Sequence, residues 1–426
     1  MQTPANPAPK PGIGRYRWII CALLFFATTV NYLDRQVFGI LGPELQKVFG
    51  WSGKDYTDIV FWFEAAYGIG LAGVGRLLDR IGTRIGYALS LVWWSVAAML
   101  HAMMSSIAGF SVARFLLGIG ESGNFPAAIK TVAEWFPRHE RAFATGIFNA
   151  GSNVGAILAP LIVPWLYITV GWQWAFIATG ACGFIWLLFW LWIYRTPDAH
   201  PRLQPAERDY INSDPPEPAT PIPWRTLFAY RQTWAIVIGK FLTDSVWRCY
   251  LYLLPLFFSQ QFNLDIKNFG PPFVIIYAIS DVGSIAGGWL SSHLLARGRT
   301  LNFSRKTAML LCALCVIPVV FVTQVGMWYA VALVSLAAAA HQGWSANIFT
   351  TASDLFPKQA VGSLVGLGGT AGAFGAMLIL KVTGYVLDLT GSFITLFVIA
   401  GSAYVIAWVI FHLLVPRMDP AKIAVG

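Results

Sequence analysis

Long apolar runs separated by short polar segments are the dominant pattern along this chain. An α-helix that crosses a bilayer needs about 20 apolar residues. Twelve runs meet this requirement, at 16–40, 56–78, 82–104, 107–130, 141–165, 172–194, 231–258, 271–296, 306–324, 327–350, 360–388 and 392–415. The pattern therefore predicts an all-α membrane protein with twelve transmembrane helices.

The longest polar stretch, residues 196–230, divides these runs into two groups of six. It contains the segment PPEPATPIP, whose prolines prevent a continuous helix. We expect an N-terminal six-helix bundle over 1–195, a cytoplasmic linker over 196–230 and a C-terminal six-helix bundle over 231–426.

The two halves also resemble each other in sequence. EWFPRHERAFATGIFNAGSNVGA from Glu134 aligns with DLFPKQAVGSLVGLGGTAGAFGA from Asp354, at an offset of 220 residues. A duplication of this kind predicts two pseudo-symmetric bundles with a binding site between them. The same alignment places Glu121 and His341 at equivalent positions.

Composition excludes a soluble multidomain protein. The chain is 57% hydrophobic and 12% charged, whereas an average soluble protein is about 25% charged. No short apolar core with a cleavage site precedes Tyr16, so we expect no cleaved signal peptide and take the first span as the export signal.

The net charge of +9 is unevenly distributed. Lys and Arg residues gather in the segments on the side of the predicted linker, and the opposite side keeps little beyond Lys47, Lys54 and Lys267. By the positive-inside rule, both termini are expected in the cytoplasm. The basic charge therefore predicts membrane topology, and we expect no nucleic-acid partner.

Four charged residues interrupt two of the predicted spans. Asp34 and Arg35 lie in the first, and Arg114 and Glu121 lie in the fourth. A charge at bilayer depth costs about 2.5–3.5 kcal/mol on insertion scales, and such residues usually mark an ion or substrate path. We expect Asp34 to pair with Arg114, which leaves Arg35 for an anion, with Asp34 and Glu121 as proton carriers. An interhelical clamp with no transport role is the alternative.

Further polar groups lie within other spans. Lys240 and Asp244 are predicted to form a structural pair, whereas Arg248 has only Asp244 near it on its own helix. Polar or amphipathic residues crowd one part of the tenth span. The candidates for substrate binding are Arg35, Tyr67, Asn149, Asn153, Trp247, Arg248, His341, Gln342, Trp344 and Asn347.

Several common chemistries lack a sequence signature here. Two G-x-G-x-x-G matches, at 68–73 and 118–123, fall within spans, where small residues allow helices to pack closely. No phosphate-binding G-x-x-x-x-G-K-[ST] loop, metal-ligand cluster or nucleophile–base pair is found, so we expect no cofactor, no metal and no enzymatic activity.

The five cysteines are interpreted as small buried hydrophobic residues, although Cys312 and Cys315 form a C-x-x-C.

Five segments carry a resemblance to a known family. GRLLDRIGTR, from Gly75 to Arg84, resembles the signature loop of the major facilitator superfamily. NYLDR (31–35) and RFLLGIGESGNFPA (114–127) are similar to the anion:cation symporters, and segments 279–292 and 339–369 are similar to bacterial hexuronate transporters. The resemblance covers nearly the whole chain.

The resemblance implies a monomeric, proton-coupled symporter that imports hexuronates or related sugar acids across the bacterial inner membrane by alternating access. It implies gating by Asp79, Arg80 and Arg84, protonation of Asp34 and Glu121 with Arg114 as the partner of Asp34, and substrate contacts from Arg35 and Tyr67. One departure is Trp247-Arg248, where hexuronate transporters carry two aromatic residues. A symporter for a dicarboxylate such as glucarate, or for an aromatic acid, therefore stays open, as do Na⁺ coupling and a sensor that binds its ligand without transport.

Overall fold

The computed structural model describes residues 14–213, 224–356 and 358–421, apart from some side chains inside helices. These residues form helices joined by short turns, and no strand occurs among them. The first part of the chain contains α1 (Tyr16–Phe49), α2 (Gly53–Ile81), α3 (Thr83–Leu100), α4 (Ile107–Glu121), α5 (Asn124–Trp135), α6 (Arg138–Val170) and α7 (Trp172–Ile193). The connecting segment contains α8 (Pro205–Ile211) and α9 (Trp224–Leu227).

The second part contains α10 (Arg231–Phe262), α11 (Gly270–Ala296), α12 (Leu301–Val316), α13 (Met327–Leu355), α14 (Lys358–Thr390) and α15 (Ile394–Leu414). The prediction of twelve membrane helices in two six-helix bundles is confirmed, with α4 and α5 together forming the fourth span. The ninth span is completed by the 3₁₀-helix η4 (Ile317–Gln324). The division into domains at 195 and 231 stays a prediction.

A proline explains the break in the fourth span. Pro126 has no N–H to donate to the carbonyl of Ser122, and the chain is interrupted between α4 and α5 at that turn. The equivalent residue in the second half, 220 positions later, is Ala346, and α13 is continuous there.

The repeat detected in sequence is visible in the helix limits. Together α4 and α5 cover 107–135, and α13 covers 327–355, which is the same interval displaced by 220 residues. The limits of α6 and α14 differ by the same offset. The two bundles are therefore built from the same succession of helices.

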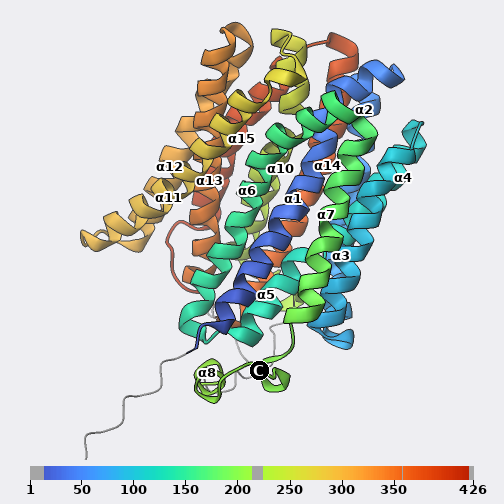
Figure 1. Ribbon diagram of the computed structural model, residues 1–426. Helices are drawn as coiled ribbons and strands as arrows, with labels where there is room; N and C mark the ends of the chain where they lie inside the picture. Colours follow the sequence, from blue (N-terminus) through green and yellow to red (C-terminus); the bar gives the residue numbers. More distant parts are fainter. Residues whose placement is uncertain (1–13, 214–223, 357, 422–426) are drawn as a thin grey trace, which may run out of the picture.

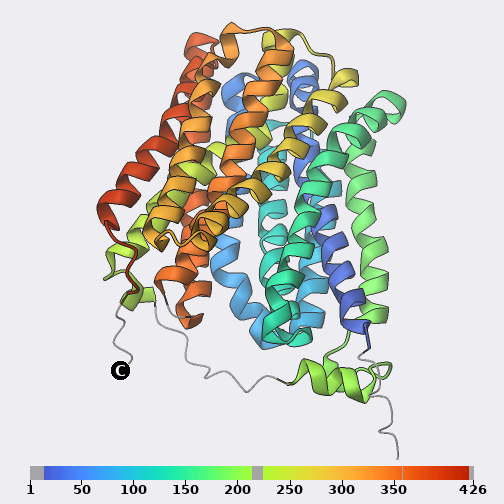
Figure 2. The same cartoon turned by 90° about the vertical axis from the view of Figure 1, so that its left-hand side faces the viewer.

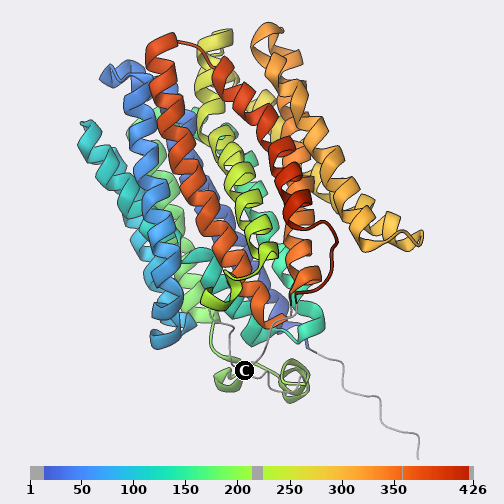
Figure 3. The same ribbon diagram turned by 180° about the vertical axis from the view of Figure 1, so that it is seen from behind.

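The chain segments between the bundles lie at one end of the molecule. In Figures 1 and 2, α8 lies below the bundle, at the end where α1 begins, and we call this the linker end. The opposite end, which contains the turn from α1 to α2, is the far end. Across the two halves α2 packs against α14, α1 against α10 and α6 against α11. Figure 3 shows the blue α2 beside the orange-red α14.

Hydrogen bonds and ion pairs join the two halves at the far end. The main-chain N–H of Lys54 donates to Asp388 at 2.9 Å, and Asp58 pairs with Lys381. The Tyr56 hydroxyl donates to the Tyr252 carbonyl at 2.8 Å. The structure is therefore a state in which the far end is closed.

Candidate functional site

A buried ion pair joins α1 to α4 near the middle of the first half. Nε of Arg35 lies 2.8 Å from Oε2 of Glu121, and the two side chains are 3% and 0% exposed. The Arg35 guanidinium also lies 4.7 Å from the ring centre of Tyr32 and 4.8 Å from that of Tyr67. Nη2 of Arg35 and Oε1 of Glu121 are buried without a hydrogen-bond partner. Buried polar atoms are rarely left unpaired, so these two atoms indicate a place for water, a proton or a ligand.

The predicted pairing of Asp34 with Arg114 was wrong. Arg114 points a nitrogen, Nη2, toward the carbonyl of Arg35 at 3.5 Å and lies over the ring of Phe38 at 4.5 Å. Asp34 is 1% exposed, and neither carboxylate oxygen has a hydrogen-bond partner. Adjacent residues on a helix point about 100° apart. Arg35 therefore faces α4, whereas Asp34 turns toward Thr179 of α7.

A second buried ion pair joins the two halves. Nη1 of Arg248, on α10, lies 2.8 Å from each carboxylate oxygen of Glu64, on α2. The Tyr252 hydroxyl donates to Glu64 at 2.8 Å as well. Glu64 is fully buried, and the Arg248 side chain is 15% exposed. Sequence reasoning assigned Arg248 no partner beyond its own helix and did not single out Glu64, although a carboxylate within the apolar run FWFEAAYG was a usable signal.

The two arginines occupy similar places in the two bundles. The helices that carry them, α1 and α10, contain internal prolines at Pro43 and Pro255. Each arginine precedes the proline of its helix by about two turns. Both guanidinium groups lie beside the ring of Tyr67, at 4.8 Å for Arg35 and 5.2 Å for Arg248.

The polar residues predicted on the tenth span are largely engaged within the second bundle. His341 lies in the buried interior and contacts the Tyr404 hydroxyl through Nδ1 at 2.6 Å. Its ring stacks on Trp247 with a centroid distance of 4.8 Å. Asn347 donates to the carbonyls of Gly287 and Gly343 at 2.9 Å, and Trp344 is buried. Gln342, the next residue on α13, is half-buried.

The remaining predicted residues are more dispersed. Asn149 is exposed on α6, and Asn153 is half-buried near Asp281 of α11. In the signature loop, Arg80 is exposed and Arg84 donates to the Leu191 carbonyl at 2.6 Å, whereas the Asp79 side chain lies outside the described part. Gating by these residues stays a prediction.

Two simpler interpretations hold in the structure. Lys240 and Asp244 form the predicted pair at 2.8 Å. The glycines of the 118–123 match lie in helix contacts, because a Cβ on Gly120 would meet the main chain of Trp94 at 2.7 Å. This motif therefore serves helix packing, as predicted.

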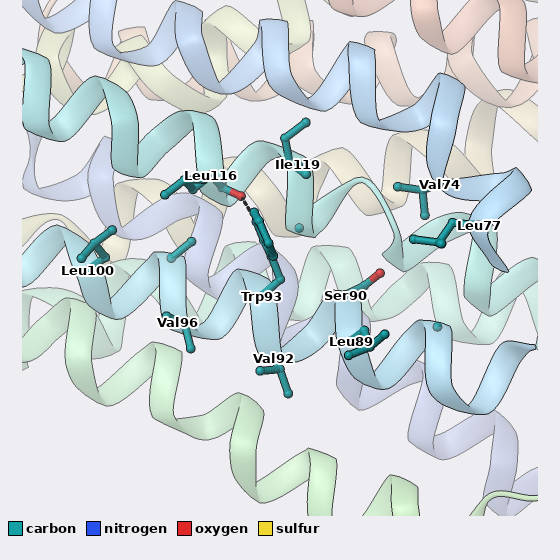
Figure 4. Close-up of a pocket in the computed structure, with 13 residues that line it drawn as sticks. Val74, Leu77, Leu89, Ser90, Val92, Trp93, Val96, Leu100, Leu116 and Ile119 are labelled. Carbon is teal, nitrogen blue, oxygen red and sulfur yellow. Dashed lines mark hydrogen bonds between the residues drawn. The ribbon is translucent and has the colours of Figure 1, made fainter. Parts of the chain in front are cut away.

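An apolar groove lies between α3 and α4, away from the charged residues. Figure 4 shows Trp93 at its centre, with its indole N–H donating to the Leu116 carbonyl at 2.8 Å. The lining side chains carry no charge, and Leu77, Leu89 and Val96 are among the exposed ones. This groove offers no counter-charge for an organic anion.

The comparisons with known proteins agree with this arrangement. The family model of the Major Facilitator Superfamily matches residues 24–380. This chain belongs to the major facilitator superfamily. Members of this superfamily are membrane transporters, so the chain is a multi-pass membrane transporter and not an enzyme.

Curated relatives within the superfamily carry sugar-acid names. The chain is 33% identical to the hexuronate transporter of Escherichia coli strain K12, with 88% of each chain covered. It is 32% identical to the galacturonate transporter of Dickeya chrysanthemi, over 64% of this chain and 81% of that protein. It is 28% identical to a probable galactarate/D-glucarate transporter of E. coli K12, over 91% of this chain and 90% of that protein.

A solved structure supports the fold. The crystal structure of a bacterial homolog of the human lysosomal transporter Spinster, in an inward-facing and occupied conformation, aligns with a TM-score of 0.75. The alignment covers 96% of this chain and 100% of that one at 17% identity. At this identity the likeness establishes the major facilitator fold alone.

Proposed function

We propose that this transporter is a proton-coupled symporter that imports hexuronates or related sugar acids across the bacterial inner membrane, with both termini in the cytoplasm. The observation that carries the proposal is the buried Arg35–Glu121 pair, which leaves one nitrogen and one carboxylate oxygen unpartnered and has the Arg35 guanidinium beside Tyr67. The names of the relatives support a sugar acid as the substrate.

The pair provides a physical reason for coupling. Arg35 can bind a substrate carboxylate strongly only when Glu121 no longer neutralises it. A proton on Glu121 removes that negative charge and releases the guanidinium for the substrate. Removing one partner of a buried pair without a replacement costs about 3–5 kcal/mol. The anion and the proton therefore stabilise the loaded site together, and each alone leaves a buried charge uncompensated.

The other predicted residues take supporting roles in this proposal. Asp34 is a second protonation site, since no cation pairs with its carboxylate and the nearest polar side chain is the Thr179 hydroxyl. Arg114 places a further positive charge next to Arg35. Tyr67 and His341 contact the hydroxyl groups of the sugar, with Asn149, Asn153 and Gln342 completing the set.

Alternating access requires the contacts at the far end to break. Lys54–Asp388, Asp58–Lys381 and Glu64–Arg248 all join the two halves there or in the middle of the molecule. In the opposite state the far end opens, and Asp79, Arg80 and Arg84 latch the linker end.

Uptake into proteoliposomes tests the proposal. Radiolabelled glucuronate is offered with and without an inward proton gradient to the wild type, to Glu121→Gln and to the control Glu44→Gln, whose carboxylate pairs with Lys47 at the far end. We expect gradient-driven accumulation by the wild type and the control. In Glu121→Gln we expect accumulation to be lost while counterflow exchange persists.

Two results would contradict the proposal. Accumulation driven by a sodium gradient but not by a proton gradient would overturn proton coupling. Uptake of an aromatic acid by a wild-type protein that takes up no sugar acid would overturn the substrate class.

A further inference from the structure

The Glu64–Arg248 pair is not used in the coupling proposed for Arg35 and Glu121. It is buried, one guanidinium nitrogen lies 2.8 Å from both carboxylate oxygens, and the carboxylate accepts a further hydrogen bond from Tyr252. It also joins the two halves, because Glu64 lies on α2 and Arg248 on α10. Replacing such a pair by apolar residues often leaves stability unchanged or improved, so stability alone does not account for it.

Geometry places Arg248 beside the proposed substrate carboxylate site. Its guanidinium carbon lies 5.2 Å from the ring centre of Tyr67, and that of Arg35 lies 4.8 Å from the same point. The two guanidinium groups are therefore no more than about 10 Å apart, on either half of the transporter. Arg248 is also the more accessible of the two, at 15% against 3%.

This separation suits an acid with two carboxylates on one short chain. Five C–C bonds of about 1.5 Å each give a six-carbon chain a length of at most about 7.5 Å. A charge-assisted hydrogen bond of about 2.8 Å at each end extends its reach beyond 10 Å. A six-carbon sugar diacid can therefore contact both arginines at once, whereas a monoacid of the same length has a neutral hydroxyl or aldehyde at one end.

We infer that Arg248 is a second carboxylate-binding position and that this transporter prefers sugar acids with a carboxylate at both ends of the chain. The inference rests on the proposed function, because it takes Arg35 as the site of the first carboxylate. Glu64 competes with the second substrate carboxylate for Arg248. A bound diacid therefore also displaces the contact that joins the two halves.

Because Glu64 competes with the substrate for Arg248, substitutions of Glu64 and of Arg248 should change glucarate binding in opposite directions. Binding is measured by titration calorimetry on the purified full-length protein with D-glucarate and D-gluconate, which differ only in carboxylate or hydroxyl at one end. We expect the wild type to bind glucarate at least roughly tenfold more tightly than gluconate. Arg248→Gln removes this preference. Glu64→Gln strengthens glucarate binding by roughly three- to tenfold, because Arg248 loses its competing anion.

Controls separate specificity from folding. The readout is the ratio of glucarate to gluconate affinity within each variant, because either substitution also alters the contact between the two halves. The double variant Glu64→Gln/Arg248→Gln leaves no unpaired charge, and it should also lose the preference for glucarate. Lys47→Gln, which removes an exposed cation at the far end, should bind both ligands as the wild type does.

The outcomes distinguish the inference from the proposed function. If both single variants weaken both ligands alike, or if the double variant keeps the glucarate preference, the pair is a structural clamp and the inference is overturned while the proposed function stands. If the wild type binds neither these acids nor glucuronate, the proposed function fails and the inference fails with it.

Discussion

Asp34 and Asp244 should respond to the same substitution with opposite changes in stability. Asp34 is 1% exposed, and both its oxygens lack a hydrogen-bond partner. Asp244 pairs with Lys240 at 2.8 Å. We expect Asp34→Asn to stabilise the folded transporter and Asp244→Asn to destabilise it, because the first replaces a buried carboxyl group that has no counter-charge and the second leaves Lys240 without its anionic partner.

The magnitudes follow from burial. Burying a polar group without a hydrogen bond costs about 1–3 kcal/mol in protein mutational data. Asparagine keeps a polar amide at position 34, so Asp34→Asn should gain about 1 kcal/mol and Asp34→Leu up to about 3 kcal/mol. Removing one partner of a fully buried pair costs about 3–5 kcal/mol. The Asp244 side chain is 20% exposed, so we reduce the expected loss to about 1–3 kcal/mol.

Thermal unfolding in detergent, followed by tryptophan fluorescence, measures both effects. For a chain of this size we expect a shift in Tm of about 1–2 °C for each kcal/mol. An equal fall in Tm for Asp34→Asn and Asp244→Asn would refute the reasoning. It would mean that Asp34 has a cationic partner in the native state, and Arg114 would again be the first candidate.

Three further substitutions test packing, the apolar groove and the linker. Gly118→Ala should lower the free energy of unfolding by about 1–3 kcal/mol, because a Cβ at that position meets the main chain and side chains of α2. Gly73→Ala is the control, because its Cβ would enter open space, and thermal unfolding compares the two variants. Trp93→Phe loses one hydrogen bond, so Tm should fall by an amount equivalent to about 0.5–1.5 kcal/mol while glucuronate uptake stays at the wild-type level. Burial and neighbouring arginines lower the pKa of His200 in the linker. Its neutral form therefore stabilises docking of the linker at neutral pH, and this contribution is lost as the pH falls below about 6.5. Limited proteolysis of the wild-type linker should therefore accelerate below that pH. Proteolysis of His200→Gln should not accelerate.

Sequence alone was sufficient for the fold because each membrane helix must contain its own apolar stretch. All twelve predicted spans correspond to helical segments, and the 220-residue repeat recurs in the helix limits. The break between α4 and α5 was missed, although Pro126 was a readable signal for it. The length of α1, which continues to Phe49, was also underestimated because the apolar run ends earlier than the helix.

The identity of the charged residues was predictable, but their partners were not. A charge inside an apolar run is conspicuous whatever it contacts, and so Asp34, Arg35 and Glu121 could be chosen from sequence. Which of two adjacent residues meets α4 depends on the rotation of α1, and hydrophobicity does not determine that angle. Arg248 and Glu64 are 184 residues apart on different halves, so no local pattern connects them.

The two buried pairs differ in what the transport cycle demands of them. The Arg35–Glu121 pair lies within one half, so it can persist while the halves move, and only a proton or an anion disturbs it. The Arg248–Glu64 pair lies between the halves, so opening of the far end must separate its charges. Separation inside a low-dielectric interior is costly unless each charge gains a substitute partner. A second substrate carboxylate supplies such a partner to Arg248 but none to Glu64, so occupancy of the site lowers the cost of separation on the arginine side of the pair.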